Sequence, residues 1–319
     1  MAHELAFRAD GSAEIAYVGE KPWHGLGDEL PKGATPDDFL RILKLPTIKR
    51  SRVRFGEGPN QQTYDGAHVL FRHDNKLPLG IVSPTYKIVQ PVQMIEFFRD
   101  VADTIGGHLE TAGVLFGGKR YWALANLGEK ETIRGNDTLA QYLLLTSSAD
   151  GSSATEARET CIRAVCNNTV SAALSMKTKH AIKVSHRSTF DAAQVKRELA
   201  ETKGHFAAFV EAARTLSRVS VTNKQAEDFL TKLLADSTTK EDVSESTGFK
   251  SIMSLFKGNA LGGTLLGVPG TAWGLVNAVT EHVDHKARAQ STENRIASAW
   301  FGRGDDLKTK AVEAALALA

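Results

Sequence analysis

The stretch DGSSATEARETCIRAVCNNTVSAAL, residues 150–174, decides how the rest of the chain is interpreted. A Ser/Gly-rich turn leads into CIRAVC, which is typical of a strand, and Asn167, Asn168 and Thr169 then open a run of small residues. The order predicts a strand that runs into a helix capped by Asn or Thr. The first N–H groups of such a helix have no backbone partner, so an anion or a partner can dock there.

Both cysteines of the chain, Cys161 and Cys166, lie in this expected strand. At a spacing of five their side chains point to opposite faces, so we expect no disulfide between them. A thiol nucleophile would need a base, and His180 and His186 are the candidates. No catalytic motif surrounds either thiol, and a small buried cysteine is the commoner outcome. We therefore predict no catalytic residues here.

Upstream of this stretch, helical and strand patterns alternate. Apolar residues recur at helical spacing over residues 35–45 and 92–106. Gly117-Gly118 fits a two-residue hairpin turn, which needs positive φ at its centre. The N-terminal half therefore indicates a mainly antiparallel sheet with packed helices, an α+β arrangement. Strands are expected at 48–55, 67–74, 77–90, 109–116, 119–127 and 140–148.

Downstream of residue 189 the periodicity is helical. Helices are expected within 190–219 and 224–236, in a short piece after residue 249, over 271–290, and as a last pair around Gly302 and Gly304. The predicted organisation is an N-terminal arm (1–30), an α+β core domain (31–176), a basic connector (177–189) and a helical region (190–319) with a polar loop at 236–248.

The charge balance limits what the whole molecule can bind. Lys and Arg number 39 against 37 Asp and Glu, a net charge of +2, so any nucleic-acid role requires a local basic patch. The N-terminus has no basic run followed by an apolar core, and no apolar stretch reaches the roughly 18 residues of a membrane helix. We expect a cytoplasmic protein with reduced thiols and no membrane contact.

Basic and aromatic residues suggest such a patch on the sheet. The strand IKRSRVRF, residues 48–55, places three arginines on one face, either as a solvated edge or as a phosphate-binding stripe. Aromatic side chains interleaved with basic ones can stack bases, although the same aromatics could be core and the charges merely solvated. The predicted phosphate contacts are Arg50, Arg52, Arg54, Lys119, Arg120, Arg163 and Lys179, with Tyr86 and Tyr121 as stacking candidates.

Sequence patterns for other chemistries are weaker. Glu281, His282, Asp284 and His285 have the spacing of metal ligands on one helix face, but no third strong ligand is evident elsewhere. A polar helix face is the favoured interpretation, and we predict no metal and no cofactor. Gly-x-Ser-x-Gly and P-loop patterns are both missing, which disfavours a hydrolase elbow and nucleotide hydrolysis. His24, in PWHGLG, is interpreted as part of an anchoring turn.

Several segments in order carry a family resemblance. They are MAHE, PWHGLG, GIVSPTYKIVQP, GVLFGGKRYWALANL, DGSSATEARETCIRAVCNNT, GTAWGLVNAVTEHVDH and SAWFG. With these segments the chain resembles a family of phage/plasmid-like proteins of unknown function, over nearly its whole length. The resemblance implies a mobile-element or prophage setting and no assigned reaction.

The layout of residues 48–174 also looks like the core of phage single-strand annealing proteins of the Red-beta, Erf and RecT kind. That likeness implies binding and annealing of single-stranded DNA in recombination, without a cofactor, by a protein that assembles into homo-oligomers. Fold alone does not establish function. The alternatives are a structural or self-assembling interaction protein of a mobile element and, second, a metal-dependent enzyme.

Overall fold

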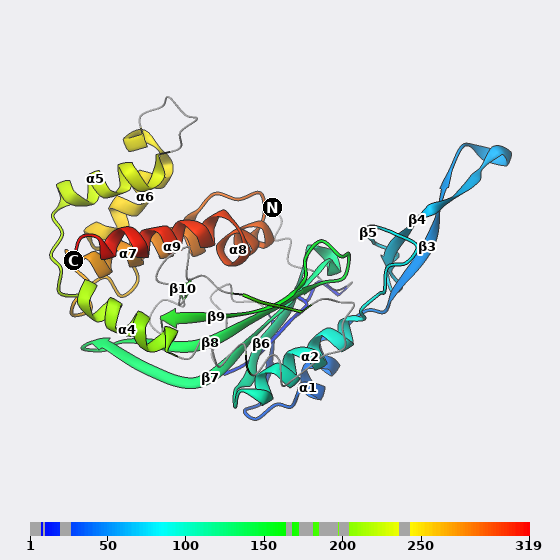
Figure 1. Cartoon of the computed structure of the whole chain (residues 1–319), viewed down its shortest axis with the longest axis horizontal. Coiled ribbons are helices and arrows are strands. Elements are labelled where there is room, and N and C mark those ends of the chain that lie inside the picture. Colours follow the sequence, from blue (N-terminus) through cyan, green and yellow to red (C-terminus); the bar gives the residue numbers. More distant parts are fainter. Residues whose placement is uncertain are drawn as a thin grey trace. The chain divides into compact units, whose positions relative to one another are not determined.

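The structure is a computed structural model that describes residues 8, 10–19, 27–163, 168–171, 181–184, 197, 204–235 and 243–319. Over these residues the chain is α+β, as predicted, with helices concentrated in the C-terminal half. One sheet has the strand order β10-β9-β8-β7-β6-β1-β2, with β11 also paired to β9, and a smaller sheet has the order β3-β4-β5 (Figure 1). The described pairings are antiparallel except that of β1 with β2.

The chain divides into two compact units that interleave along the sequence. Unit 1 comprises residues 1–127, 143–158 and 181–201, and unit 2 comprises residues 128–142, 159–180 and 202–319. The organisation predicted from the sequence divides the chain into consecutive segments, whereas each of these units combines segments that are separated along the chain. Three strands supply residues to both units: β7 (Arg120–Arg134), β8 (Asp137–Ser148) and β9 (Thr155–Arg163).

Unit 1 packs two helices on strand β6 (His108–Leu115). Helix α1 (Pro36–Leu43) begins at a capping box formed by Thr35 and Asp38, and α2 (Pro91–Thr104) begins at Gln90. Both helices were predicted within two residues of these bounds. Their apolar faces and the sheet form one core, which includes Phe39, Leu43, Ile95, Phe98, Val101, Ala112, Val114 and Tyr121. The short strands β1 (Ile15–Val18) and β2 (Asp28–Leu30) extend the sheet beyond β6.

The turn between β6 and β7 is longer than predicted. Leu115 pairs with Arg120, so four residues connect the strands and not the two that Gly117-Gly118 suggested. A 3₁₀ turn at Phe116–Gly118 fills the connection, with φ of 54° at Phe116, 64° at Gly117 and 106° at Gly118. The glycines supply the positive φ that this turn requires, so the residue type was interpreted correctly and the loop length was wrong.

Unit 2 contains the C-terminal helices. Helix α7 (Ala272–Glu281) is buried at every position and packs with α4 and α9 around a second core, distinct from that of unit 1. The sequence prediction of helices in this half is confirmed for the described residues. The helices are α4 (His205–Leu216), α5 (Asn223–Leu234), α6 (Thr247–Ser254), α7, α8 (Thr292–Phe301) and α9 (Arg303–Leu316), with π-helical turns at Leu255–Asn259 and His282–Lys286.

The helix expected after Cys166 is wrong in the described part. Residues Asn168–Ser171 form strand β10, which pairs with β9. Thr169 is held in extended form from the helical layer: its N–H donates to Asp284 Oδ2 (2.7 Å), and the Lys308 ammonium donates to its carbonyl (2.6 Å). A short strand, β11 (Ile182–Val184), also lies within the expected connector and pairs with β9.

Candidate nucleic-acid interface

The small sheet of unit 1 carries several exposed charged side chains, and we call residues 48–82 the arm. It consists of β3 (Ile48–Phe55), β4 (Gln62–Arg72) and β5 (Pro78–Val82). Strand β3 has the bounds that the sequence predicted, whereas β5 ends eight residues earlier than expected. The arm begins inside the core of unit 1, because Ile48 is buried there and the Gln90 side chain bonds both its N–H (2.9 Å) and its carbonyl (3.0 Å).

A buried ion pair fixes the other side of this base. The Arg72 guanidinium donates to both carboxylate oxygens of Glu14 (2.6 and 3.0 Å), and both side chains are nearly inaccessible. Asp74 accepts two further bonds from Arg72, and the pKa of its carboxyl is lowered chiefly by them. The carbonyl of Gly117 accepts from the same guanidinium at 3.2 Å. Arg72 therefore joins the end of β4 to the residue that precedes β1 and to the β6–β7 turn.

Beyond this base the arm thins to two strands. Strand β5 pairs only with residues 68–71 of β4, so residues 53–64 form a ribbon of β3 and the first part of β4 (Figure 1). A register shift between Arg52 and Val53 marks the transition. Neither face of a two-stranded ribbon is covered by another layer of its own sheet, so its side chains stay exposed on both sides.

The two faces of the arm differ in chemistry. Directly opposed residues of an antiparallel pair share a face, and alternate residues of a strand point to opposite faces. One face, the cationic face, carries Arg50, Arg52 and Arg54, whose β4 partners are Leu70, His68 and Thr63. The other, the apolar face, carries Val53, Phe55, Tyr64, Val69, Phe71 and Ile81.

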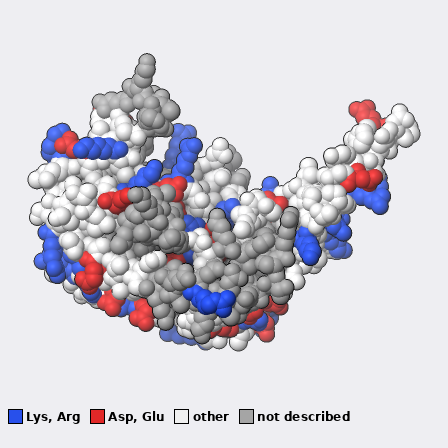
Figure 2. Space-filling view, in the orientation of Figure 1, with Lys and Arg blue, Asp and Glu red and all other residues white. Residues whose placement is uncertain are grey.

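The cations of β3 have no acidic partner among the described residues. Lys49, Arg50, Arg52 and Arg54 are all exposed and none forms an ion pair with a described carboxylate. The described bonds of their guanidinium groups are long ones, from Arg50 to the Pro84 carbonyl (3.4 Å) and from Arg54 to the Gln61 side chain (3.5 Å). Figure 2 shows Lys and Arg side chains on the arm, together with acidic side chains toward its tip. The predicted arginine stripe is therefore accessible.

Two lysines lie near the histidine at the arm's base. Exposed His73 follows β4, and the charges of Lys49 and Lys76 lower the pKa of its imidazole, while Asp74 acts in the opposite direction. Cations at short range disfavour a further positive charge. The two lysines therefore outweigh the one carboxylate in their effect on His73.

The turn between β6 and β7 supplies one accessible cation. Lys119 is exposed, whereas Arg120 is half-buried. Burial lowers the pKa of Arg120, and the nearby carboxylates of Asp150 and Glu156 act in the opposite direction. Lys119 therefore stays a candidate phosphate contact. Arg120 is a weaker candidate, because the carboxylates of Asp150 and Glu156 already lie near its guanidinium. Lys179, also predicted as a contact, lies outside the described residues.

Arg163 does not fit its predicted role, because it is buried in unit 2. It is 1% exposed and donates to Asp137 Oδ1 (2.6 Å) and Oδ2 (3.0 Å). The Trp273 indole N–H shares Asp137 Oδ2 at 2.8 Å. The guanidinium also reaches the carbonyls of Leu261 and Gly262. This network joins β8, β9, α7 and the loop after α6, so Arg163 is corrected from a phosphate contact to a core residue.

The two stacking candidates lie in different environments. Tyr121 is fully buried, and burial raises the pKa of its hydroxyl, so its predicted stacking role is wrong. Tyr86 is half-buried, lies against Gly151 and donates to the Ala149 carbonyl (3.4 Å). The sequence analysis missed two aromatics that are exposed, Phe55 (54%) and Tyr64 (53%). Both are exposed because β3 and β4 extend beyond the end of β5, which the local sequence pattern does not show.

The possible catalytic groups are engaged elsewhere. Glu281 accepts from the Leu261 N–H (2.9 Å), and burial raises the pKa of its carboxyl. His282 Nδ1 lies 2.9 Å from Ser251 Oγ, and burial lowers the pKa of the imidazole. Asp284 Oδ1 pairs with the buried Lys308 ammonium at 2.8 Å. Across the part of the chain that the structure describes, no cluster of three possible ligands for a metal ion is found.

Cys161 is buried, and burial raises the pKa of its thiol. A protonated, inaccessible thiol is a poor nucleophile, so the described geometry gives this cysteine a core role. Cys166 and the proposed bases His180 and His186 lie outside the described residues.

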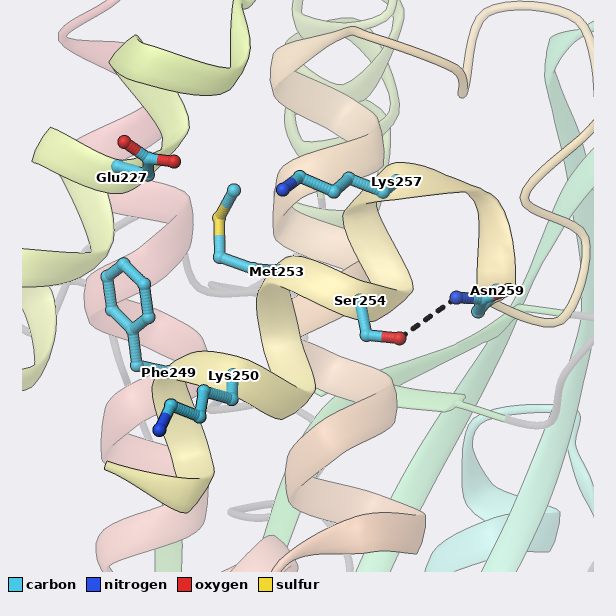
Figure 3. A pocket seen from close by; sticks show the side chains of 7 residues that line it. All are labelled: Glu227, Phe249, Lys250, Met253, Ser254, Lys257 and Asn259. Atoms are coloured by element: carbon cyan, nitrogen blue, oxygen red, sulfur yellow. Dashed lines mark hydrogen bonds between the residues drawn. The ribbon is translucent and has the colours of Figure 1, made fainter. Parts of the chain in front are cut away.

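An open pocket of about 400 Å³ lies between α5 and α6 in unit 2 (Figure 3). Phe249 and Met253 form its apolar floor, and Glu227 and Lys257 stand on opposite sides. Lys250 at its rim is paired with Glu245 at 2.6 Å, and Asn259 bonds Ser254 at 2.9 Å. These groups include no nucleophile paired with a base. The pocket has the character of a surface groove between helices.

Among the described residues, no helix combines the length and apolarity that crossing a bilayer requires. The family model "Domain of unknown function (DUF932)" matches residues 78–300. A search of curated proteins gave no match, and neither did a search of solved structures. The matched range includes Asp137, Arg163 and Trp273 and begins after the end of β4.

Proposed function

The chain belongs to the family of the domain of unknown function DUF932, which assigns no reaction, and we propose from the arm that it binds single-stranded DNA and anneals complementary strands without a cofactor. The observation that carries this proposal is the set of exposed cations on β3, which no described carboxylate neutralises. A phage or plasmid setting, cytoplasmic and linked to recombination, is the context in which we propose that it acts.

The spacing of the arginines suits a phosphate backbone. Alternate residues on a β-strand are about 7 Å apart, so Arg50, Arg52 and Arg54 present a regular row of guanidinium groups along the cationic face. Each of the three can bind one phosphate of a DNA strand laid along that row. Arginine suits this role because its guanidinium binds phosphate oxygens in a bidentate manner.

A preference for single strands needs a surface for bases. Arg50 bonds the carbonyl of Pro84, two residues before Tyr86, so the cationic face continues toward the partly exposed Tyr86 ring. Stacking of a base on an aromatic ring contributes about 1–3 kcal/mol and tolerates any sequence. We propose Tyr86 as the stacking residue next to the phosphate contacts, with Lys119 as a further cation.

The experiment is a salt titration with a labelled oligonucleotide. Replacing Arg50, Arg52 and Arg54 together by Gln removes three phosphate contacts, so the slope of log affinity against log salt should fall by about 2. A matched control replaces Lys224, Lys232 and Lys250 by Gln, which removes the same net charge from α5 and α6. It should keep the slope.

Two results would overturn the proposal. The first is that the protein has no affinity for single strands even at low salt. The second is that the salt slope falls equally in both triple variants, which would show that only the net charge of the protein matters. Annealing is measured separately, as the rate at which a dye-labelled and a quencher-labelled complementary strand pair. The arginine variant should slow this rate, and the lysine variant should not.

A further inference from the structure

The apolar face of the arm is an exposed surface, which the described residues of unit 1 leave uncovered. Ile81 is 70% exposed, and Phe55 and Tyr64 are each more than half exposed. Val53, Val69 and Phe71 lie between them and are half-buried. Scattered single apolar residues on a surface are ordinary, whereas these share one face of one sheet, and a contiguous patch of this kind marks an interaction site.

We infer that this apolar face binds the same face of a second copy of the chain, so that two arms pack face to face in an antiparallel pair. Opposed β-sheets pack about 10 Å apart through interdigitated apolar side chains. An isologous pair of this kind is related by a two-fold axis, the commonest symmetry of soluble oligomers.

The distribution of charge favours a second copy. The cross-strand rows on this face run from Lys49/Phe71/Pro78 through Ser51/Val69/Ile81 and Val53/Tyr64 to Phe55/Gln62. Lys49 is the only ionisable group in these rows apart from the Tyr64 phenol, and the Lys76 ammonium lies 6.0 Å from the centre of the Phe71 ring, in the same row as Lys49. All three arginines of β3 are on the opposite face and would point away from the partner arm. Face-to-face packing therefore brings no arginine of one copy toward an arginine of the other.

The direction of the pair follows from the same rows. In an antiparallel pair the two Lys49 ammonium groups lie at opposite ends of the contact, about 20 Å apart over three row spacings. That separation is about two Debye lengths at physiological salt, whereas a parallel pair would oppose the two ammonium groups directly. The antiparallel order also sets Tyr64 of one copy against Val69 and Ile81 of the other, an aromatic ring on branched aliphatic groups.

The exposed area predicts a weak dimer. An aromatic side chain buries about 150–250 Å² when it is fully covered, so half-exposed Phe55 and Tyr64 offer about 100 Å² each and Ile81 a similar area. Two copies then bury less than the roughly 1,200 Å² of a standard interface, which places the pair in the transient class. The arrangement leaves both cationic faces free, so it is independent of the proposed DNA binding.

A lipid surface is the main rival for an exposed apolar sheet. If the apolar face of the arm bound a bilayer, Arg50, Arg52 and Arg54 would point away from the lipid headgroups. Membrane-binding segments instead place their cations where they reach anionic lipid while the apolar side enters the interface. On the arm the cations and the apolar side chains lie on opposite faces, which favours a protein partner that itself has an apolar face.

The first test measures the mass of the full chain in solution by sedimentation equilibrium across the micromolar range. The mass should rise from monomer toward dimer with concentration. The double variant Tyr64→Ser, Ile81→Ser should weaken the association at least about tenfold, since two large apolar groups are lost from each copy. The control Arg52→Gln, Arg54→Gln changes the cationic face only and should leave the association unchanged. A monomer at every concentration, or an association that the Ser variant leaves intact, overturns the inference.

The second test reports on the arm directly and does not depend on how strongly other surfaces associate. In a Cys166→Ser background, Tyr64→Cys and Ile81→Cys chains are mixed and oxidised with copper phenanthroline. The mixture should form a disulfide-linked dimer faster than either chain alone, because the antiparallel order brings position 64 of one copy to position 81 of the other. Equal rates in all three samples overturn the antiparallel pair. Co-sedimentation of the monomeric chain with anionic vesicles that the Ser variant abolishes would also overturn it and identify lipid as the occupant.

Discussion

Arg163 in unit 2 and Arg52 on the arm are the same side chain on a β-strand, yet their surroundings are opposite. Arg163 is 1% exposed, and both oxygens of Asp137 accept from its guanidinium. Arg52 is exposed, and no described carboxylate pairs with it. A charge removed from water requires a partner, whereas an exposed charge is solvated and remains available for a ligand. Arginines of the first kind hold the fold together, and those of the second kind can bind.

The family match covers one of these two arginines and not the other. It spans residues 78–300, which include Arg163, its partner Asp137 and Trp273, and it begins after β3 and β4. Arg52 therefore lies outside the matched range, and the function proposed for the arm needs its own tests.

The largest effect should come from removing the partner of Arg163. Asp137→Asn keeps the shape of the side chain but removes the carboxylate that accepts two hydrogen bonds from the buried guanidinium, so the free energy of unfolding should fall by about 3–5 kcal/mol. Urea denaturation measures it. Glu131→Gln is the matched control, because Glu131 pairs with Arg214 at the surface and such pairs contribute about 0–1 kcal/mol. A loss below about 1 kcal/mol in Asp137→Asn would contradict the role given to this network.

A smaller effect is expected in the salt dependence of two histidine pKa values, those of His73 and His282. Burial lowers the pKa of His282, whereas Lys49 and Lys76 lower that of His73. Salt screens charges at the surface but not burial, so in NMR titrations high salt should raise the pKa of His73 and leave that of His282 low. His73→Gln and His282→Gln identify the two resonances. Equal salt responses would contradict the assigned causes.

The pH dependence of stability has a definite sign for His282. As the pH falls through about 6.5, the unfolded chain takes up a proton on this residue while the folded chain does not. The contribution of His282 to the free energy of unfolding is therefore present above that pH and declines below it. His282→Gln can still bond Ser251 and should show a flatter stability profile between about pH 7.5 and 5.5.

The smallest effect should be that of Arg52→Gln on stability. An exposed side chain without an ionic partner changes the free energy of unfolding by less than about 0.5 kcal/mol. The measurement is the same urea denaturation as for Asp137→Asn. A loss above about 1 kcal/mol would show that Arg52 supports the fold after all and would remove the contrast with Arg163.

The helices and strands that were found from the sequence are those whose formation depends on residues close together in the chain. Strand β3 alternates over 48–55, and the apolar residues of α1 recur at helical spacing, so both were found from the sequence. Strand β10 was missed because its small residues and Asn resemble a helix start, while Asp284 and Lys308, more than a hundred residues away, hold Thr169 extended. Long-range partners override weak local propensity.

The candidate site divides in the same way. The arginines of β3 were found because alternation alone places them on one face. Arg163 and Tyr121 were misassigned, because burial depends on Asp137 in one case and on the helical layer of unit 1 in the other. Phe55 and Tyr64 were overlooked because their exposure follows from where β5 ends, which no local pattern near them records.

Strands β7, β8 and β9 each cross the border between the units, and this governs how the protein can be taken apart or recombined. Ile133 lies in one core and Tyr121 in the other, on the same strand. A single cut or a single crossover between related genes cannot separate the two units, because a break at any position leaves at least one of them divided. Exchange of one whole unit would require several crossovers, although each unit has a hydrophobic interior of its own.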